Sequence, residues 1–196
     1  MSEQLWAFVP FMLVMTSTPG PGNLTMLAIG QSTGWRSSLP FLMGGAVGFT
    51  ALNSAVACGL GGLVAASPGA ALAMRCIGAV YICWLALKVL RMHASEPGPA
   101  RRFTFAEGVL LHPLSPKSWA MSTAGFALLV DPAHPLFPQA AAFVLLFLAG
   151  MLTFHSLWCV GGAGLLRLLR PGAARLAVNA LLALLMVGST VAALFV

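Results

Sequence analysis

Acidic side chains are nearly absent from this chain, which has only four aspartates and glutamates among its 196 residues. Charged residues of all kinds make up 7%, hydrophobic residues make up 59%, and the mean hydropathy is +0.93. A soluble domain needs far more polar surface than this composition provides. The sequence therefore excludes an ordinary soluble class and indicates a protein embedded in lipid.

Cysteine is also scarce, and its spacing excludes the common redox and zinc motifs. The four cysteines, Cys58, Cys76, Cys83 and Cys159, lie in apolar stretches and form no Cys-x-x-Cys pair. The sequence offers no clustered ligands of the kind that zinc or copper needs. We expect the cysteines to be packing residues, and we expect neither a metal nor a cofactor.

The formal charge of +6 would suit a nucleic-acid partner, but the basic residues do not gather on a soluble segment. They fall in alternate loops between the apolar stretches. One set of loops carries Arg36, then Lys88, Arg91, Arg101 and Arg102, then Arg167, Arg170 and Arg175, and the other side has Arg75, Glu3 and Asp131. Because basic residues favour the cytoplasmic side, we expect both termini outside and no nucleic-acid partner.

Turn signals such as Ser67-Pro68-Gly69 and Arg170-Pro171-Gly172 divide the chain into long apolar stretches. A membrane-spanning helix needs roughly 20 mostly apolar residues. The stretches predict six spans, at about residues 5–29, 38–64, 70–90, 105–130, 138–164 and 173–195. The predicted fold class is therefore an all-α integral membrane protein.

Two of these spans are interrupted by proline, at Thr18-Pro19-Gly20-Pro21-Gly22-Asn23 and at His112-Pro113-Leu114-Ser115-Pro116-Lys117. Proline removes a backbone donor and clashes with the preceding turn, so the freed polar groups must face protein, water or a ligand. Paired breaks at corresponding places in two halves are typical of transporter substrate sites.

The breaks suggest a single membrane domain, residues 1–196, made of two halves. Residues 1–92 and 103–196 would each hold three spans beginning with a broken helix, and residues 93–102 would form a cytoplasmic linker. An odd number of spans inverts the second half relative to the first, so we predict an inverted repeat. Glycines in the second and fifth spans should pack helices within one subunit, with a homodimer interface as the alternative.

Each break has the local sequence of a helix start. Thr18 before Pro19, and Ser115 before Pro116, look like an N-cap followed by proline at the first helical position. Helix N-termini present free N–H groups and partial positive charge, which suit a carboxylate. The predicted substrate-binding residues are Thr18, Pro19, Gly20, Pro21, Gly22, Asn23, His112, Ser115, Pro116 and Lys117.

Lys117 is the most informative of these residues, because a mid-membrane lysine costs about 2.5–3.5 kcal/mol unless it finds a partner. It would assist in binding the carboxylate of an amino acid. The alternatives are that its ammonium reaches toward an interface or bonds carbonyls freed by the opposite break. For Asn23, pairing with freed backbone and contact with substrate remain equally open.

Three motifs in order resemble the LysE/RhtB amino-acid exporters of bacteria. These are Pro19-Gly20-Pro21-Gly22-Asn23, the stretch from Gly78 to Arg91, and Ser115-Pro116-Lys117-Ser118-Trp119. The resemblance covers nearly the whole chain and implies export of amino acids across the bacterial inner membrane, driven by the proton motive force. Ser115 and Gly22 each stand where the family commonly has asparagine, and His112 stands where glutamine is common.

The residues themselves leave the coupling route open. Glu107, His112 and His155 are the titratable groups within or at the ends of the spans that could carry a proton, and packing is the alternative for the histidines. Tyr81 and Trp84 lie one turn apart on the third span. We expect them to pack, with cavity lining as the alternative.

The scarcity of acids favours neutral substrates, since a cationic amino acid would need a carboxylate for its side chain. Threonine, homoserine and leucine are examples that the resemblance permits. We do not expect an enzyme, because His112, Ser115 and Lys117 follow no hydrolase motif. The remaining alternative is a membrane receptor or assembly subunit that transports nothing.

Overall fold

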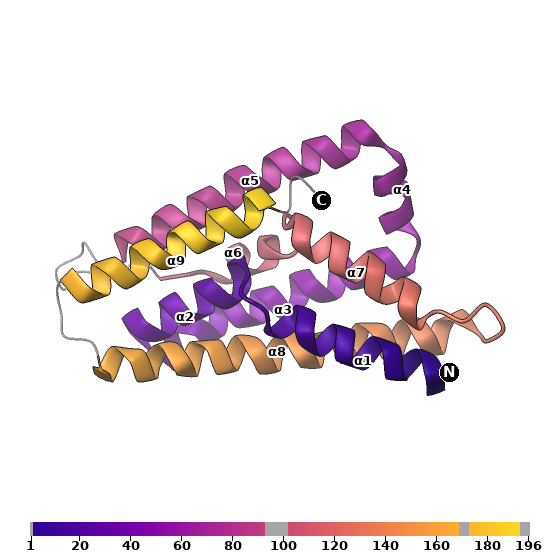
Figure 1. The fold of residues 1–196 in the computed structure, drawn as a ribbon, viewed down its shortest axis with the longest axis horizontal. Helices are drawn as coiled ribbons and strands as arrows, with labels where there is room; N and C mark the ends of the chain where they lie inside the picture. The colour runs from indigo at the N-terminus through magenta and orange to yellow at the C-terminus, as the bar shows by residue number, and fades with distance from the viewer. Residues whose placement is uncertain (1, 93–101, 169–172, 193–196) are drawn as a thin grey trace.

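The computed structural model describes residues 2–92, 102–168 and 173–192, and all regular structure in these ranges is helical (Figure 1). The elements are α1 (Ser2–Ser17), α2 (Pro21–Thr33), α3 (Trp35–Ala57), α4 (Leu60–Ala66), α5 (Pro68–Arg91), α6 (Phe105–Leu111), α7 (Pro116–Leu129), α8 (Leu136–Leu168) and α9 (Ala173–Ala192).

Both predicted breaks are present. α1 ends at Ser17 and α2 begins at Pro21, and α6 ends at Leu111 and α7 begins at Pro116. In Figure 1, α1 starts at the end of the molecule where the N-terminus lies and α2 continues toward the opposite end, whereas α7 runs back toward the first end. The two broken segments therefore run in opposite directions and are interrupted near the middle of the molecule.

Three of the described helices have the length and hydropathy needed to cross a membrane, namely Trp35–Ala57, Pro68–Arg91 and Leu136–Leu165. Residues Leu176–Ala192 form a shorter apolar helix. These four elements coincide with four of the six predicted spans, to within a few residues at their ends. Of the predicted linker, residues 93–101 lie outside the described residues.

The predicted span at 38–64 is wrong in one respect, because it is not one continuous helix. α3 ends at Ala57, and Gly59 adopts the left-handed conformation with φ of 92° before α4 begins. The N–H of Gly59 donates to the carbonyl of Val56 at 2.9 Å, which closes the last turn of α3. Glycine reaches this conformation without the steric cost that a side chain would bring.

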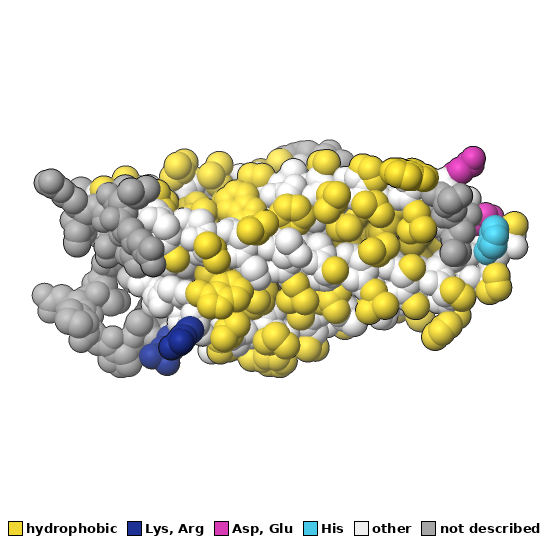
Figure 2. Space-filling model, turned by 90° about the horizontal axis from the view of Figure 1, so that it is seen from below, with side chains coloured by type: hydrophobic (Ala, Val, Ile, Leu, Met, Phe, Trp, Pro, Cys, Tyr) yellow, Lys and Arg dark blue, Asp and Glu magenta, His cyan; other side chains and the backbone are white. Residues whose placement is uncertain are grey.

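The outer surface has an apolar band between two polar ends. On the face in Figure 2, hydrophobic side chains cover the middle, lysine and arginine lie toward one end, and acidic side chains and histidine lie at the other. Such a band is what a lipid environment requires. Of the four cysteines only Cys159 is buried, so the predicted packing role fails for Cys58, Cys76 and Cys83, which are exposed.

Glycines allow two pairs of helices to touch through their backbones. A Cβ atom added to Gly44 of α3 would overlap the carbonyl of Phe105 in α6, and one added to Gly108 would overlap the carbonyl of Phe41. In the same way, Gly162 of α8 lies directly against the carbonyl of Leu27 in α2. These glycines let α3 pack closely against α6 and α8 against α2. The packing of helices within one subunit that the sequence predicts for glycines of the second and fifth spans is therefore present at these positions.

We predict that Gly44→Ala destabilises the protein while Gly161→Ala does not. The added methyl at position 44 meets main chain that cannot turn aside, and overpacking of this kind costs about 1–3 kcal/mol. Nothing lies within 4 Å of a Cβ at Gly161, which makes it a matched control. Thermal unfolding of the two variants in detergent checks this. Equal melting temperatures would contradict the packing described.

Candidate functional site

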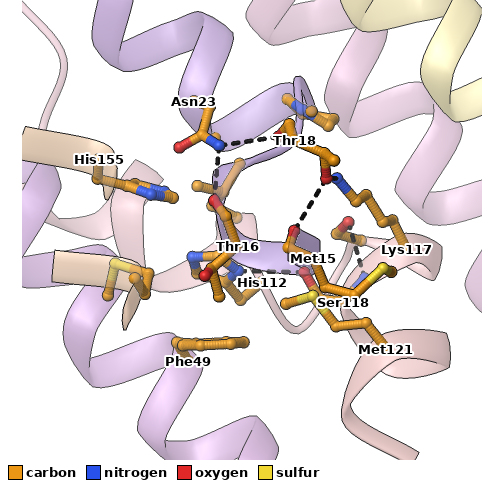
Figure 3. Close-up of a pocket in the computed structure, with 16 residues that line it drawn as sticks. Met15, Thr16, Thr18, Asn23, Phe49, His112, Lys117, Ser118, Met121 and His155 are labelled. Carbon is orange, nitrogen blue, oxygen red and sulfur yellow. Dashed lines mark hydrogen bonds between the residues drawn. The ribbon is translucent and has the colours of Figure 1, made fainter. Parts of the chain in front are cut away.

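The two breaks share a cavity of about 40 Å³ near the middle of the molecule (Figure 3). Residues from both breaks line it together with side chains of α1, α3 and α8. Eight of the ten predicted substrate-binding residues border this cavity: Thr18, Gly20, Pro21, Gly22, Asn23, His112, Ser115 and Lys117. The other two, Pro19 and Pro116, are not among its described lining residues.

The second break starts α7 as the sequence predicts. Ser115 is the N-cap residue, its hydroxyl accepts from the N–H of Ser118 at 3.4 Å, and Pro116 occupies the first turn. The first break differs from the prediction. α2 begins at Pro21 with Gly20 as its N-cap, whereas the hydroxyl of Thr18 donates back to the carbonyl of Met15 in α1. Thr18 therefore completes the end of α1.

Lys117 joins the two breaks. Its Nζ donates to the hydroxyl of Thr18 at 2.9 Å and to the carbonyl of Pro19 at 3.4 Å. A Cβ at Gly20 would lie 3.0 Å from that Nζ, so the glycine leaves room for the ammonium. The ammonium thus lies at the opposite break, beside the residues that precede α2 (Figure 3).

The side chain of Asn23 hydrogen-bonds the backbone through its amide nitrogen and also borders the cavity. Its Nδ2 donates to the carbonyls of Thr16 at 2.8 Å and Thr18 at 2.9 Å, two acceptors that the end of α1 leaves free. Its Oδ1 is buried and has no hydrogen-bond partner among the described residues. The side chain is only 4% exposed, so this oxygen is a buried acceptor that no donor of the described residues satisfies.

Two buried histidines lie beside each other at the cavity. The ring centroids of His112 and His155 are 5.6 Å apart, and each side chain is 5% exposed. Nδ1 of His112 lies 3.1 Å from the hydroxyl of Ser118, and Phe49 packs on the same imidazole at 4.4 Å between centroids. Within the described part of the chain, Nε2 of His112 and both nitrogens of His155 lack partners.

These unpaired atoms indicate a site that holds something polar. Leaving a buried donor or acceptor unsatisfied costs about 1–3 kcal/mol, so groups of this kind normally bind water or a ligand. Asn23, His112 and His155 come from different segments and all border the same cavity. The cavity volume is enough for a water molecule or a small polar group.

Three further predicted residues lie away from this cavity. Glu107 forms an ion pair with Lys88, and its carboxylate also accepts from the N–H of Thr104 at 2.5 Å, which caps α6. The hydroxyl of Tyr81 donates to the carbonyl of Glu107 at 2.5 Å. Tyr81, Trp84 and Glu107 are absent from the described lining of the central cavity.

Several residues that line the cavity were not among the site residues predicted from the sequence. Thr16, Phe49, Ser118, Met121 and Met151 all border the cavity. Ser118 is the exception that the sequence could have indicated, because it lies on the first turn of α7 just after a proline. Phe49 reaches the site only because α3 packs tightly against α6, which no local pattern reveals.

A second, larger cavity of about 640 Å³ adjoins the site. It is lined mainly by apolar side chains of α4, α5 and α7, and it shares Met15 and Lys117 with the central cavity. Arg75 of α5 also borders it. Lys117 therefore lies between a small polar cavity and a wide apolar one.

Comparison with known proteins gives the family context for this arrangement. The family model described as LysE type translocator matches residues 13–196. A cysteine/O-acetylserine efflux protein of Escherichia coli strain K12 is 30% identical over 188 residues, covering 93% of each chain, and one of Shigella flexneri gives the same values. A Vibrio cholerae protein described as an uncharacterized membrane protein is 29% identical over 146 residues, or 71% of each chain. No solved structure matches the chain at a significant level.

Proposed function

The chain belongs to the LysE type translocator family, and on that premise we propose that it exports small neutral amino acids by alternating access. The observation that carries the proposal is the cavity where the two broken helices meet, with Lys117 on one side and unpaired polar atoms on the other. Membership of a translocator family supports transport, and three described helices are long and apolar enough to cross a membrane.

The carboxylate of the substrate would bind at Lys117. The N-termini of α2 and α7 both border the cavity. The partial positive charge of each helix end adds to the positive charge of the Lys117 ammonium, so all three favour a bound anion. In a site from which water is largely excluded, such donors interact more strongly with an anion than they would in water. To bind, the carboxylate would replace the hydroxyl of Thr18 as the partner of Lys117.

The ammonium and side chain of the substrate would face the other wall. The free Oδ1 of Asn23 is an acceptor suited to the ammonium, and the two histidines can hydrogen-bond a small polar side chain. None of the described residues that line the cavity is acidic, which disfavours lysine or arginine as cargo. The cysteine/O-acetylserine efflux relatives support a small neutral substrate.

The proposed topology has six crossings in two inverted halves within a bacterial inner membrane. The order of a broken helix followed by two further spans occurs twice, and the broken segments run in opposite directions. Arg36, Lys88, Arg91 and Arg102 would lie on the cytoplasmic side, which places both termini in the periplasm.

For coupling we propose His155 and His112 as the groups that take up a proton, because an imidazole nitrogen can bind and release a proton and both side chains line the substrate cavity. We predict that His155→Gln retains substrate exchange in liposomes but loses accumulation driven by a pH gradient, by about tenfold or more. The exposed His134→Gln serves as control and should behave as wild type. A His155→Gln variant still driven by the gradient would exclude that residue from coupling.

The experiment for the proposal itself loads cells with dipeptides and follows the release of each amino acid. Cells that express the chain should release cysteine-like or other small neutral amino acids faster than cells that carry an empty vector. A receptor or assembly subunit that transports nothing would leave release at the vector rate, and purified protein would then catalyse no flux in liposomes.

A further inference from the structure

A third cavity lies at the end of the molecule where α5 finishes and α6 begins. It measures about 360 Å³ and is lined by Trp84, Leu87, Lys88, Arg91 and Arg102. Three of these five side chains are basic, and the other two are apolar and about half exposed, at 46% for Trp84 and 50% for Leu87. None of them borders the central cavity, so this site is separate from the proposed transport site.

The side chain of Lys88 is held in a defined position. Nζ of Lys88 donates to the carbonyl of Arg102 at 3.0 Å and forms an ion pair with Glu107. The same Nζ lies over the Phe103 ring at 4.5 Å and over the Trp84 ring at 5.5 Å. These contacts fix the end of α5 against the segment that leads into α6, and both Lys88 and Arg102 line the cavity.

An exposed apolar stripe leads along α5 to this cavity. Ile77, Val80, Trp84 and Leu87 are each at least 46% exposed, and their spacing of three or four residues puts them on one helical face that continues to Arg91. From Ile77 to Leu87 the helix rises about 15 Å. That length is about half the hydrocarbon thickness of a bilayer, so an acyl chain of one leaflet can lie along the stripe.

We propose that this cavity binds the headgroup of an anionic phospholipid, with an acyl chain along the α5 stripe. Arginine and lysine donate charge-assisted hydrogen bonds to phosphate oxygens, and basic pockets beside membrane helices suit such headgroups. Trp84 lies at the junction of polar and apolar surface, where tryptophan is favoured in membranes. A zwitterionic headgroup fits less well, because its own cation would meet the basic wall.

The test titrates the purified protein in detergent with phosphatidylglycerol, phosphatidylcholine or inorganic phosphate and follows the melting temperature. The wild type should reach half-saturation at a concentration of phosphatidylglycerol about tenfold below that of phosphatidylcholine, and phosphate should have no comparable effect. Arg91→Gln/Arg102→Gln should abolish this preference. Arg36→Gln removes an exposed charge near the same end without touching the cavity, and it should keep the preference.

Several results would overturn the proposal. Equal effects of the two lipids would mean that only the apolar stripe binds, and an equal effect of phosphate would mean a site for a free anion. Loss of the preference in Arg36→Gln would mean diffuse attraction and no defined site. As a second measurement, phosphatidylglycerol with brominated acyl chains should quench tryptophan fluorescence less in Trp84→Phe than in the wild type, and unchanged quenching would contradict the position of the lipid.

Discussion

Replacing Lys117 with methionine is expected to reduce amino-acid efflux at least about 30-fold, close to the rate of cells without the protein. Methionine keeps much of the side-chain length but removes the charge that we propose for the substrate carboxylate. Losing one partner of a buried ionic hydrogen bond costs about 2–4 kcal/mol, which corresponds to a factor of about 30 to 1000. Efflux from dipeptide-loaded cells measures the effect, with membrane insertion checked by immunoblot.

A purely structural role for Lys117 makes a different prediction. Its ammonium also ties α7 to the first break through the hydroxyl of Thr18. Thr18→Val removes that hydroxyl but leaves the charge, so it should retain most of the transport if Lys117 binds substrate. If Thr18→Val and Lys117→Met lose stability and transport to the same degree, the role of Lys117 is to connect the two breaks through its hydrogen bond to Thr18, and not to bind substrate. Arg36→Met controls for the loss of a basic residue outside the cavity.

Replacing Gly22 with valine is expected to abolish transport while leaving the chain inserted. A Cβ atom at this position would lie 2.6 Å from Nε2 of His155 and 3.2 Å from a methyl of Leu111. The imidazole must then move, and the extra carbons fill a cavity of only about 40 Å³. Substrate and side chain cannot occupy that volume together, so we expect transport to fall at least about tenfold.

The matched control is Gly62→Val on α4, where an added Cβ meets nothing within 4 Å. It makes the same chemical change away from the cavity, and its transport should stay near the wild-type rate. Normal transport by Gly22→Val would contradict the position of the site.

The breaks themselves were predictable because proline acts locally. Ser115 and Pro116 begin α7 as their residue types require. The first break offers two prolines, and the sequence favoured Pro19 although α2 begins at Pro21. The difference arises because Thr18 bonds back to Met15 and because Asn23 and Lys117 bind the groups between, contacts that depend on the folded arrangement.

Other features depend on tertiary packing and gave no local signal. The left-handed Gly59 that separates α3 from α4 lies in an apolar run that hydropathy alone merges into one span. The ion pair between Lys88 and Glu107 joins residues 19 positions apart in the sequence, so no local pattern indicates it. The packing of Phe49 on His112 likewise follows from the glycine contact between α3 and α6.

The central claim is that Lys117 and two helix N-termini bind the carboxylate of an amino acid. The most direct test reconstitutes the purified protein in liposomes and measures exchange of labelled cysteine against unlabelled cysteine or its methyl ester, which lacks the carboxylate. We predict that the amino acid competes at least about 30-fold better than the ester in the wild type, and that Lys117→Met loses most of this difference. An ester that competes as well as the amino acid in the wild type would contradict the account.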